Sequence, residues 1–416
     1  MGYSCMTRAF HRSVRERDAC KTDGSPAERN LPMKLAIVYD VVFPYVKGGG
    51  ERRYFEIAKR LAGKHQVHLY SMKLWEGPDN LITEEGIYLH GVCPARPLYV
   101  QGRRSIGQAL YYSAYLLAAL LREDYDLVDC GSAPYLPIFS ARLWATIKHR
   151  PLVVSWLEYW GGLWFQYLGR LKGIFGWAVE RLGTMLPDHI LAISGHTCDA
   201  LVGAGVPRGR ITVIPCGVDW QELQSIAPSS ESSDLISVGR LIREKNVALL
   251  VQVVAALKVN HPNISCFIVG DGPERDALCK LAAELGVEHN VRFWGRVDTS
   301  EEVYALMKSS RIFVTLSERE GFNIVALEAS ACGLPVVLTR GTHNATTELI
   351  ADGKTGIICD PSYEDVTAAI ERLLENDSLC DEMSERALEH SSHYDWDLVA
   401  RDVERFYEEI TRASNS

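Results

Sequence analysis

Residues 34–70 read KLAIVYDVVFPYVKGGGERRYFEIAKRLAGKHQVHLY. The run from Lys34 to Tyr39 is short and apolar, which is typical of a buried strand, and a loop with three consecutive glycines, Gly48 to Gly50, follows it. Apolar side chains then repeat at helical spacing between Tyr54 and Leu61, and Val67 to Tyr70 forms a second apolar run. The stretch predicts one β-loop-α-β unit, the building block of a doubly wound parallel sheet.

The same alternation restarts after residue 230. A Ser-rich segment, Ala227 to Ser233, precedes a strand predicted over Leu235 to Val238 and the basic loop Arg240 to Lys245. Further strands are predicted at Ser265 to Val269, Val291 to Trp294, Ile312 to Thr315 and Pro335 to Leu338. Short strands alternating with helices predict two Rossmann-like α/β domains, with a ligand cleft at the carboxyl ends of both sheets.

Four segments follow from this pattern. We assign residues 32–215 to an N-terminal domain, 216–395 to a C-terminal domain, and 396–412 to an amphipathic closing helix that packs back toward the N-terminal domain. Residues 1–31 mix both charges without the apolar core of a signal peptide, so we interpret them as a disordered extension. Ile106 to Leu121 is the longest apolar stretch; it is shorter than the ~20 residues of a spanning helix, and we predict a buried helix.

Composition narrows the function classes. The 416 residues are 47% hydrophobic and 23% charged, which is enough for two globular cores. The net charge of -9 gives no electrostatic case for nucleic acid as a partner. The eleven cysteines include no C-x-x-C pair, so we expect neither a zinc nor a redox site, no other metal or cofactor, and a reducing cytoplasm as the location.

The segment Ser317 to Glu328, SEREGFNIVALE, lies between an apolar strand and a predicted helix. If that helix starts near Phe322, the backbone N–H groups of Phe322 to Ile324 point at the cleft and attract a diphosphate. Glu320 then precedes the helix, and Glu328 lies inside it, about 9 Å along its axis. One carboxylate can hold a sugar and the other a ribose; the alternative is that both are solvated acids.

Two cations follow the first strand of the C-terminal half. Arg240 comes directly after a strand and its glycine, and Lys245 follows five residues later. A diphosphate that leaves during a reaction needs such neutralisation, by the planar fork of an arginine and the point charge of a lysine. A solvated basic loop is the alternative interpretation.

Taken together, these motifs resemble glycosyltransferase family 4, the retaining GT-B enzymes, over residues 33–412. The motifs that carry the resemblance are Gly48-Gly49-Gly50-Glu51, Ile214-Pro215-Cys216-Gly217-Val218-Asp219, Gly239-Arg240 with Lys245, Val269-Gly270-Asp271-Gly272-Pro273, and Glu320 to Glu328. The resemblance implies a hexosyltransferase that moves a sugar from a UDP- or GDP-sugar to a hydroxyl of a glycan or a lipid-linked acceptor. The acceptor would bind the N-terminal domain, and the donor nucleotide the C-terminal domain.

The same resemblance implies roles for individual residues. Arg240 and Lys245 would bind the donor diphosphate, and Glu320 would contact the sugar hydroxyls. Further donor-binding groups would be Glu328 at the ribose, the backbone N–H groups of Gly321, Phe322, Asn323 and Ile324, the closing loop with Gly48 and Gly49, and Gly295 with Arg296 near the nucleobase. The Gly270-Asp271-Gly272-Pro273 segment is expected to make a tight turn.

One departure from the family pattern concerns Val153 to Trp160. Where the family often has a histidine facing the donor sugar, this sequence has Leu157, and Glu158 is then the nearest polar group on the sugar or acceptor side. A core strand with an aromatic cap is the alternative. Leu157 motivates a second hypothesis, a nucleotide-sugar-binding protein with weak or no transfer activity. A nicotinamide dehydrogenase is disfavoured because the first loop lacks G-x-G-x-x-G.

Peripheral membrane contact is a further hypothesis, which would place the chain on the cytoplasmic membrane face. Two features motivate it: Arg170 to Leu182 mixes basic and aromatic residues, and a second group of cations comprises Lys47, Arg52, Arg53, Lys59, Arg60 and Lys64. Solvated helix faces explain the same residues.

Overall fold

The structure is a computed structural model that describes residues 31–100 and 103–415. The extension predicted over residues 1–31 therefore lies outside the described residues, apart from Leu31. The residues from Met33 onward form one compact unit, and every contact discussed below lies within it.

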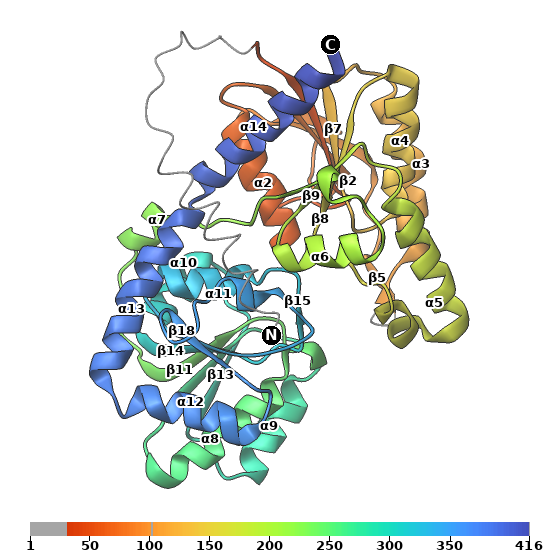
Figure 1. The fold of residues 1–416 in the computed structure, drawn as a ribbon. Helices are drawn as coiled ribbons and strands as arrows, with labels where there is room; N and C mark the ends of the chain where they lie inside the picture. The colour runs from red at the N-terminus through yellow and green to blue at the C-terminus, as the bar shows by residue number, and fades with distance from the viewer. Residues whose placement is uncertain (1–30, 101–102, 416) are drawn as a thin grey trace. The chain divides into compact units, whose positions relative to one another are not determined.

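An eight-stranded sheet forms the N-terminal half (Figure 1). Its order is β10-β9-β8-β7-β1-β2-β4-β3, and all neighbours are parallel except β3 and β4. The strands are β1 (Lys34–Val38), β2 (Gln66–Lys73), β3 (Asn80–Ile82), β4 (Tyr88–Pro94), β7 (Leu127–Gly131), β8 (Leu152–Trp156), β9 (His189–Ala192) and β10 (Ile211–Val213). A separate ribbon pairs β5 (Tyr99–Val100) with β6 (Arg103–Arg104).

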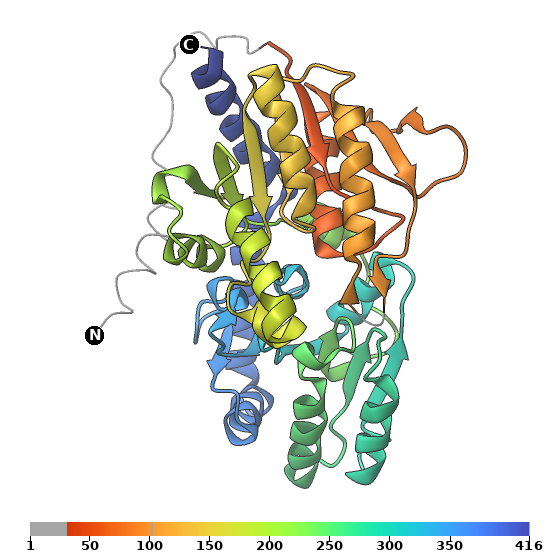
Figure 2. The same cartoon turned by 90° about the vertical axis from the view of Figure 1, so that its right-hand side faces the viewer.

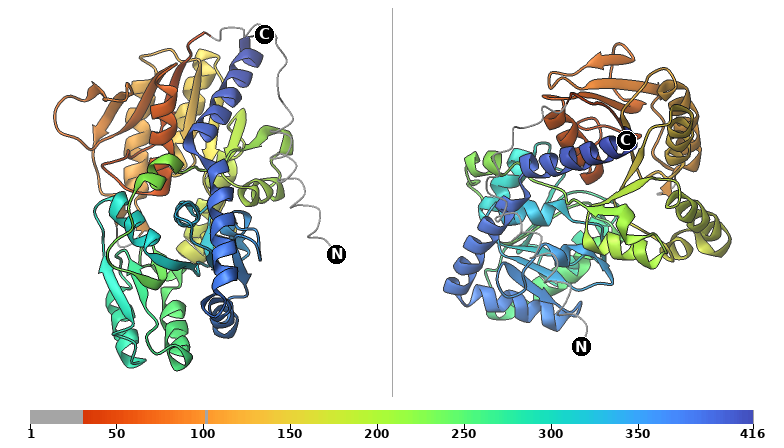
Figure 3. Two further views of the ribbon diagram at one scale, coloured as in Figure 1. Left: turned by 90° about the vertical axis from the view of Figure 1, so that its left-hand side faces the viewer. Right: turned by 45° about the horizontal axis from the view of Figure 1, so that its top comes forward.

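Helices cover both faces of this sheet, as parallel β/α connections require. On one face α2 (Gly49–Leu61) packs against α14 (Trp396–Asn415), the long helix that ends the chain (Figure 3). On the other face lie α3 (Ile106–Leu120) and α4 (Leu136–Lys148), side by side, and α5 (Leu163–Gly183), which bends at Gly169, contacts α4 and extends past the edge of the sheet (Figure 2). A short helix, α6 (Gly195–Gly203), follows β9.

A six-stranded parallel sheet of order β13-β12-β11-β14-β16-β18 forms the C-terminal half. Its strands are β11 (Ser233–Val238), β12 (Cys266–Val269), β13 (Val291–Gly295), β14 (Ser310–Thr315), β16 (Val336–Thr339) and β18 (Gly356–Cys359). Its helices are α7 (Trp220–Ser225), α8 (Val247–Asn260), α9 (Arg275–Glu284), α10 (Ser300–Lys308), α11 (Ile324–Ala331), α12 (Tyr363–Leu374) and α13 (Asp377–Ser391). Two short strands, β15 (Arg319–Glu320) and β17 (His343–Asn344), pair beside this sheet.

The short apolar runs of the sequence are strands because they are buried on both faces. β1, β7, β8 and β16 illustrate this, since nearly all of their side chains are buried. The strands predicted from sequence are present, with ends that differ by at most three residues.

The prediction that Ile106 to Leu121 is a buried helix is wrong for one side of α3. Leu116 and Leu120 are buried against the sheet, whereas Ile106, Leu110 and Leu121 are exposed. An apolar pattern reports which residues are apolar, but the neighbours of a helix decide which of its sides is covered. Among the described residues, no helix combines the length and apolar character needed to cross a bilayer.

Candidate active site

The loop after β11 carries the two predicted cations. Arg240 is exposed directly after the strand, and Lys245 ends the short 3-10 helix η2 (Arg243–Lys245). A small hollow opens here, and its lining includes Arg240, Lys245 and Ser317. The carboxyl ends of β11 and β14 therefore meet at a hollow, as open parallel sheets commonly arrange their ligand sites.

Two glycines of the Gly270-Asp271-Gly272-Pro273 segment allow this loop to pack closely. A Cβ at Gly270 would collide with the carbonyl oxygen of Gly239, and a Cβ at Gly272 would collide with that of Leu241. Gly270 also has a φ of 134°, which side chains rarely adopt. The segment thus supports the cation loop by backbone-to-backbone approach.

Lys245, which lines this hollow, forms an ion pair with Glu320. Both side chains are largely buried, and 75 residues separate them along the chain. β15 positions Glu320 by pairing with β17, whose Asn344 is buried and donates to the carbonyl oxygens of Ser317 and Thr339. The structure thus joins the predicted cation to the first of the two predicted acids.

Helix α11 starts at Ile324, two residues later than predicted. Asn323 precedes it with a φ of 72°, and its side chain accepts a hydrogen bond from the Ala326 N–H at 3.2 Å. This side-chain cap decides the helix start. Phe322 is buried, so its backbone but not its ring can serve the site. The first turn of the helix still presents the backbone amides of Ile324 and Val325, which have no acceptor within the helix.

The N-terminal half contributes its glycine loop to the same place. A Cβ at Gly49 would lie 3.2 Å from the Ile324 side chain, and one at Gly50 would lie 3.0 Å from that of Leu157. Gly321 in turn lies against the Leu157 carbonyl oxygen, where a Cβ would collide. Gly48, immediately before α2, takes an extended conformation as the N-terminal cap residue. Backbone from both halves therefore lines the site closely.

Glu158 stands beside Glu320 on the N-terminal side. Its carboxylate pairs with Arg319 at 3.1 Å and accepts from the Trp160 indole N–H at 3.0 Å. Burial raises the pKa of Glu158; Arg319 opposes this rise, and the charge of Glu320 adds to it. Arg319 also lies over the Trp160 ring, 4.3 Å from its centre.

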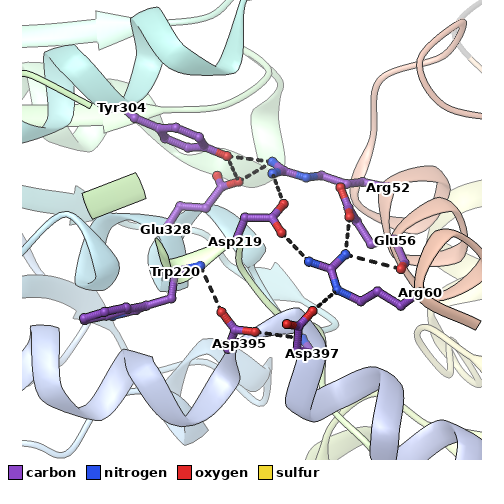
Figure 4. Close-up of polar contacts among 9 residues, drawn as sticks. All are labelled: Arg52, Glu56, Arg60, Asp219, Trp220, Tyr304, Glu328, Asp395 and Asp397. Carbon is purple, nitrogen blue, oxygen red and sulfur yellow. Dashed lines mark hydrogen bonds and ion pairs between the residues drawn. The ribbon is translucent and has the colours of Figure 1, made fainter. Parts of the chain in front are cut away.

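Glu328 is engaged within the protein (Figure 4). It is buried, and its Oε1 accepts hydrogen bonds from Arg52 at 2.6 Å and from the Tyr304 hydroxyl at 2.7 Å. Burial works to lower the pKa of Arg52, but Glu328, Tyr304 and Glu56 together outweigh it, so the pKa is raised. The carboxylate predicted at the ribose is thus held by a cation from α2, 276 residues away in sequence.

The remaining contacts in Figure 4 continue from α2 toward the end of the chain. Arg60 pairs with Glu56 on its own helix, with Asp219, and with Asp397 at 2.6 Å. Asp395 accepts from the Trp220 N–H at 3.2 Å and from the Asp397 N–H at 2.7 Å. These charged groups are therefore bound to partners within the protein.

The two residues predicted near the nucleobase, Gly295 and Arg296, lie at and just after the end of β13. Gly295 ends β13 with a φ of 71°, and its carbonyl oxygen accepts from the Gly270 N–H at 2.8 Å. Arg296 is exposed beside it. Neither has a recorded contact with the Lys245–Glu320 pair within the described residues.

Two family models divide the chain between them. Residues 47–222 match the model of Glycosyltransferase Family 4, and residues 218–390 match that of Glycosyl transferases group 1. The chain belongs to glycosyltransferase family 4.

Relatives and solved structures agree with this family. The glycogen synthase of Mycobacterium tuberculosis (strain CDC 1551 / Oshkosh) is 31% identical over 237 residues, which cover 55% of this chain and 56% of that protein. The chain thus spans a little over half of that relative. The sucrose-phosphate synthase of Thermosynechococcus elongatus has a TM-score of 0.77 at 19% identity, covering 92% of this chain and 100% of that one.

A third similar protein is Anabaena HepE, whose structure was solved in complex with UDP-glucose. It has a TM-score of 0.68 at 20% identity and covers 90% of this chain and 99% of HepE. At these identities the two structures show the fold alone. This family 4 chain therefore has the GT-B fold, two parallel sheets with helices on their faces.

Several residues near the family site were missed by sequence reasoning. Burial raises the pKa of Glu51; the charge of Asp40 acts in the same direction, while Arg104 and Arg240 oppose it. Arg104 pairs with the fully buried Asp40 at 2.6 Å. Glu51 carried a signal, since it directly follows the three glycines, but the pairing of Arg104 with Asp40 depends on a contact 64 residues apart.

The cations of α2 do not form a free basic surface. Arg52 binds Glu328, Arg60 binds three carboxylates, and the fully buried Arg53 donates to the carbonyl oxygens of Ile214 and Pro215. Lys64 pairs with Glu404, and Lys47 donates to the Asp298 carbonyl oxygen. The arginines of this group are therefore occupied by internal partners, while Lys59 is exposed, and membrane contact through this group stays a prediction.

Two His/Glu groups have ligand atoms near one another: His65 with Glu404 and Glu408, and His261 with Glu371 and Glu375. Neither contains a predicted site residue. His65 is already bonded to Glu404 at 3.1 Å.

Proposed function

We propose that this chain is a retaining hexosyltransferase that moves a sugar from a UDP- or GDP-sugar to a hydroxyl of a glycan or lipid-linked acceptor. The observation that carries the proposal is the Lys245–Glu320 ion pair, which lies beside Arg240 and the entrance of α11. The nine cysteines of the described residues are free thiols, which supports a cytoplasmic location for this activity.

Donor binding would exchange partners within this site. The ammonium group of Lys245 and the guanidinium group of Arg240 would bind the diphosphate oxygens. Backbone amides of Gly321 to Val325 would complete the anion site. Glu320, released from Lys245, would then accept hydrogen bonds from sugar hydroxyls. An ion pair that is already assembled keeps both groups in position, so little reorganisation is needed when charge develops on the leaving group.

The transfer step itself needs no nucleophile from the protein. The bond from the anomeric carbon to the diphosphate oxygen breaks, and the acceptor hydroxyl oxygen forms a bond on the same face. Its proton passes to the leaving diphosphate. The contribution of the chain is charge stabilisation by Arg240 and Lys245 and orientation by Glu320.

HepE was solved with UDP-glucose, and the similarity to it makes a UDP-sugar the first donor to test. Ribose binding by Glu328 would compete with its hydrogen bonds from Arg52 and Tyr304. We therefore expect Glu328→Gln to act mainly on the KM for the donor, while Glu320→Gln acts on kcat.

The test is release of UDP or GDP from a panel of donors. Lys245→Ala should lower turnover by about 10²–10³-fold, because it removes a preorganised cation from the leaving group. Lys280→Ala is the matched control. Lys280 is exposed, and among the described residues its only ion pair is with Glu284 on the same helix. Unchanged turnover in both Lys245→Ala and Glu320→Gln, with measurable activity in the parent, would remove the proposal.

A second candidate function is nucleotide-sugar binding without transfer, which Leu157 favours. Its side chain approaches Gly50 where the family often places a histidine. Calorimetry that finds donor binding, combined with no release of UDP or GDP across the acceptor panel, would select this function.

A further inference from the structure

The outer side of α3, α4 and α5 is unusually apolar for a surface that faces water. Helices α3 and α4 lie side by side on one face of the N-terminal sheet, and α5 contacts α4 and extends past the edge of the sheet (Figure 2). The exposed large apolar residues on them are Ile106, Leu110 and Tyr115 on α3, Phe139, Leu143 and Ile147 on α4, and Phe165, Leu171, Ile174, Phe175, Trp177 and Leu182 on α5. We call this set the apolar face.

The spacing shows that α4 carries a second apolar side. Phe139, Leu143 and Ile147 recur every four residues and so share one side of α4, whereas Trp144 on the opposite side is fully buried. A helix that is apolar all round belongs in a core or against another apolar medium. The inner side of α4 packs into the core, and its outer side has no partner among the described residues.

Helix α5 reverses the usual arrangement of large and small residues. The element bends at Gly169, whose φ is 76°, and the buried positions after the bend include Gly173 and Gly176, where a Cβ would crowd Phe165 and Trp164 of the part before it. Its outward residues are large: Leu171 is 86% exposed and Phe175 is 56% exposed. Folding the domain does not require these outward side chains, so their apolar character points to an external contact.

The charges on the same helices are nearly all positive. Across α3, α4 and α5 the cations are Arg142, Lys148, Arg170, Lys172 and Arg181, and the single acid is Glu180. Glu180 is fully buried, where it accepts from the N–H groups of Trp160 and Gly161. Arg142 and Lys148 pair with Asp188 and Asp124 outside the helices. Arg170 and Lys172 flank Leu171 and have no ion pair within the described residues.

We propose that the apolar face docks on a bilayer that contains anionic lipids. Leu171 and Phe175 would enter the interface, while Arg170 and Lys172 remain at the level of the headgroups. A second copy of the chain fits less well. A two-fold contact would place these unpaired cations against each other, and the three helices carry no exposed acid that could neutralise them. This surface is separate from the donor site and does not depend on the proposed transfer reaction.

The test is flotation of the full chain with phosphatidylcholine vesicles, with and without phosphatidylglycerol. We expect binding to the anionic vesicles at low salt that weakens as salt is added. The double variant Arg170→Gln/Lys172→Gln should lower the partition coefficient by about tenfold or more, since each cation near an anionic surface contributes on that order. The triple variant Leu171→Ser/Ile174→Ser/Phe175→Ser should lose binding.

Controls separate this surface from others. Val259→Ser on α8 is the matched apolar control, because Val259 is 79% exposed on the other half of the chain, and it should bind like the parent. The triple variant should keep the parent's donor binding in calorimetry, which shows that its fold and donor site survive. A parent chain that fails to float with anionic vesicles overturns the proposal, as does a triple variant that binds them normally. Self-association abolished by the triple variant, without lipid binding, would assign the face to a second copy. Loss of donor turnover in Lys245→Ala bears only on the transfer reaction.

Discussion

The helices on the two sides of the N-terminal sheet (Figure 1) use their side chains in opposite ways. On the face of α2 and α14, charged residues are drawn inward: Arg53 is fully buried and Arg60 binds three carboxylates. On the face of α3, α4 and α5, apolar residues such as Leu110 and Leu171 are left outside. On these helices, charge alone therefore does not mark the exposed side, and apolar character alone does not mark the buried side. The neighbours that each helix meets decide both.

The largest expected effect is on the charged face. Arg53→Met should destabilise the chain by about 3–5 kcal/mol, because it leaves the buried carbonyl oxygens of Ile214 and Pro215 without their donor. Lys59→Met on the same helix is the control, since Lys59 is exposed, and its effect should stay within about 0.5 kcal/mol. Denaturant unfolding of both variants is the measurement; similar midpoints would mean that the α2 arginines are not structural.

A second pair of variants tests the two sides of α3. Leu116→Ala should cost about 2–5 kcal/mol, because Leu116 is fully buried and its removal leaves a cavity. Leu110→Ala on the same helix should cost about 0.5 kcal/mol or less, because Leu110 is exposed. Thermal unfolding of the two variants side by side checks this. Equal losses would show that the outer side of α3 is covered within the folded chain.

The smallest expected effect concerns the contact between α2 and Glu328. Tyr304→Phe removes one of two hydrogen bonds to this buried carboxylate and should cost about 1.5–3 kcal/mol, less than the loss of Arg53. Arg52 remains to pair with Glu328, which limits the loss. The unfolding midpoint gives the cost, and an unchanged midpoint would show that Arg52 alone satisfies the carboxylate.

Local features of the sequence were predictable because they depend on near neighbours. The runs that became β1, β11 and β14 could be recognised, since a strand buried on both faces must be short and apolar. The start of α11 was predicted two residues early, because the cap depends on the αL conformation of Asn323, which periodicity does not report.

The candidate site was predictable as a set of residues but not as a set of contacts. Arg240, Lys245 and Glu320 could be singled out by residue type and position after strands. The pairing of Lys245 with Glu320 could not be predicted, because the two residues lie far apart in the sequence. The pairing of Glu328 with Arg52 could be predicted even less, because Arg52 lies in the other half of the chain.

By itself, the sequence determined the alternation of strands and helices, the two α/β halves and the family motifs, because short-range periodicity and spacing encode them. Only the tertiary structure decided that the α2 arginines are internal, that α3 has an exposed apolar side, and that Glu328 is paired. Each of these depends on which surfaces distant segments bury against each other, and burial sets the cost of leaving a charge or an apolar side chain unpartnered.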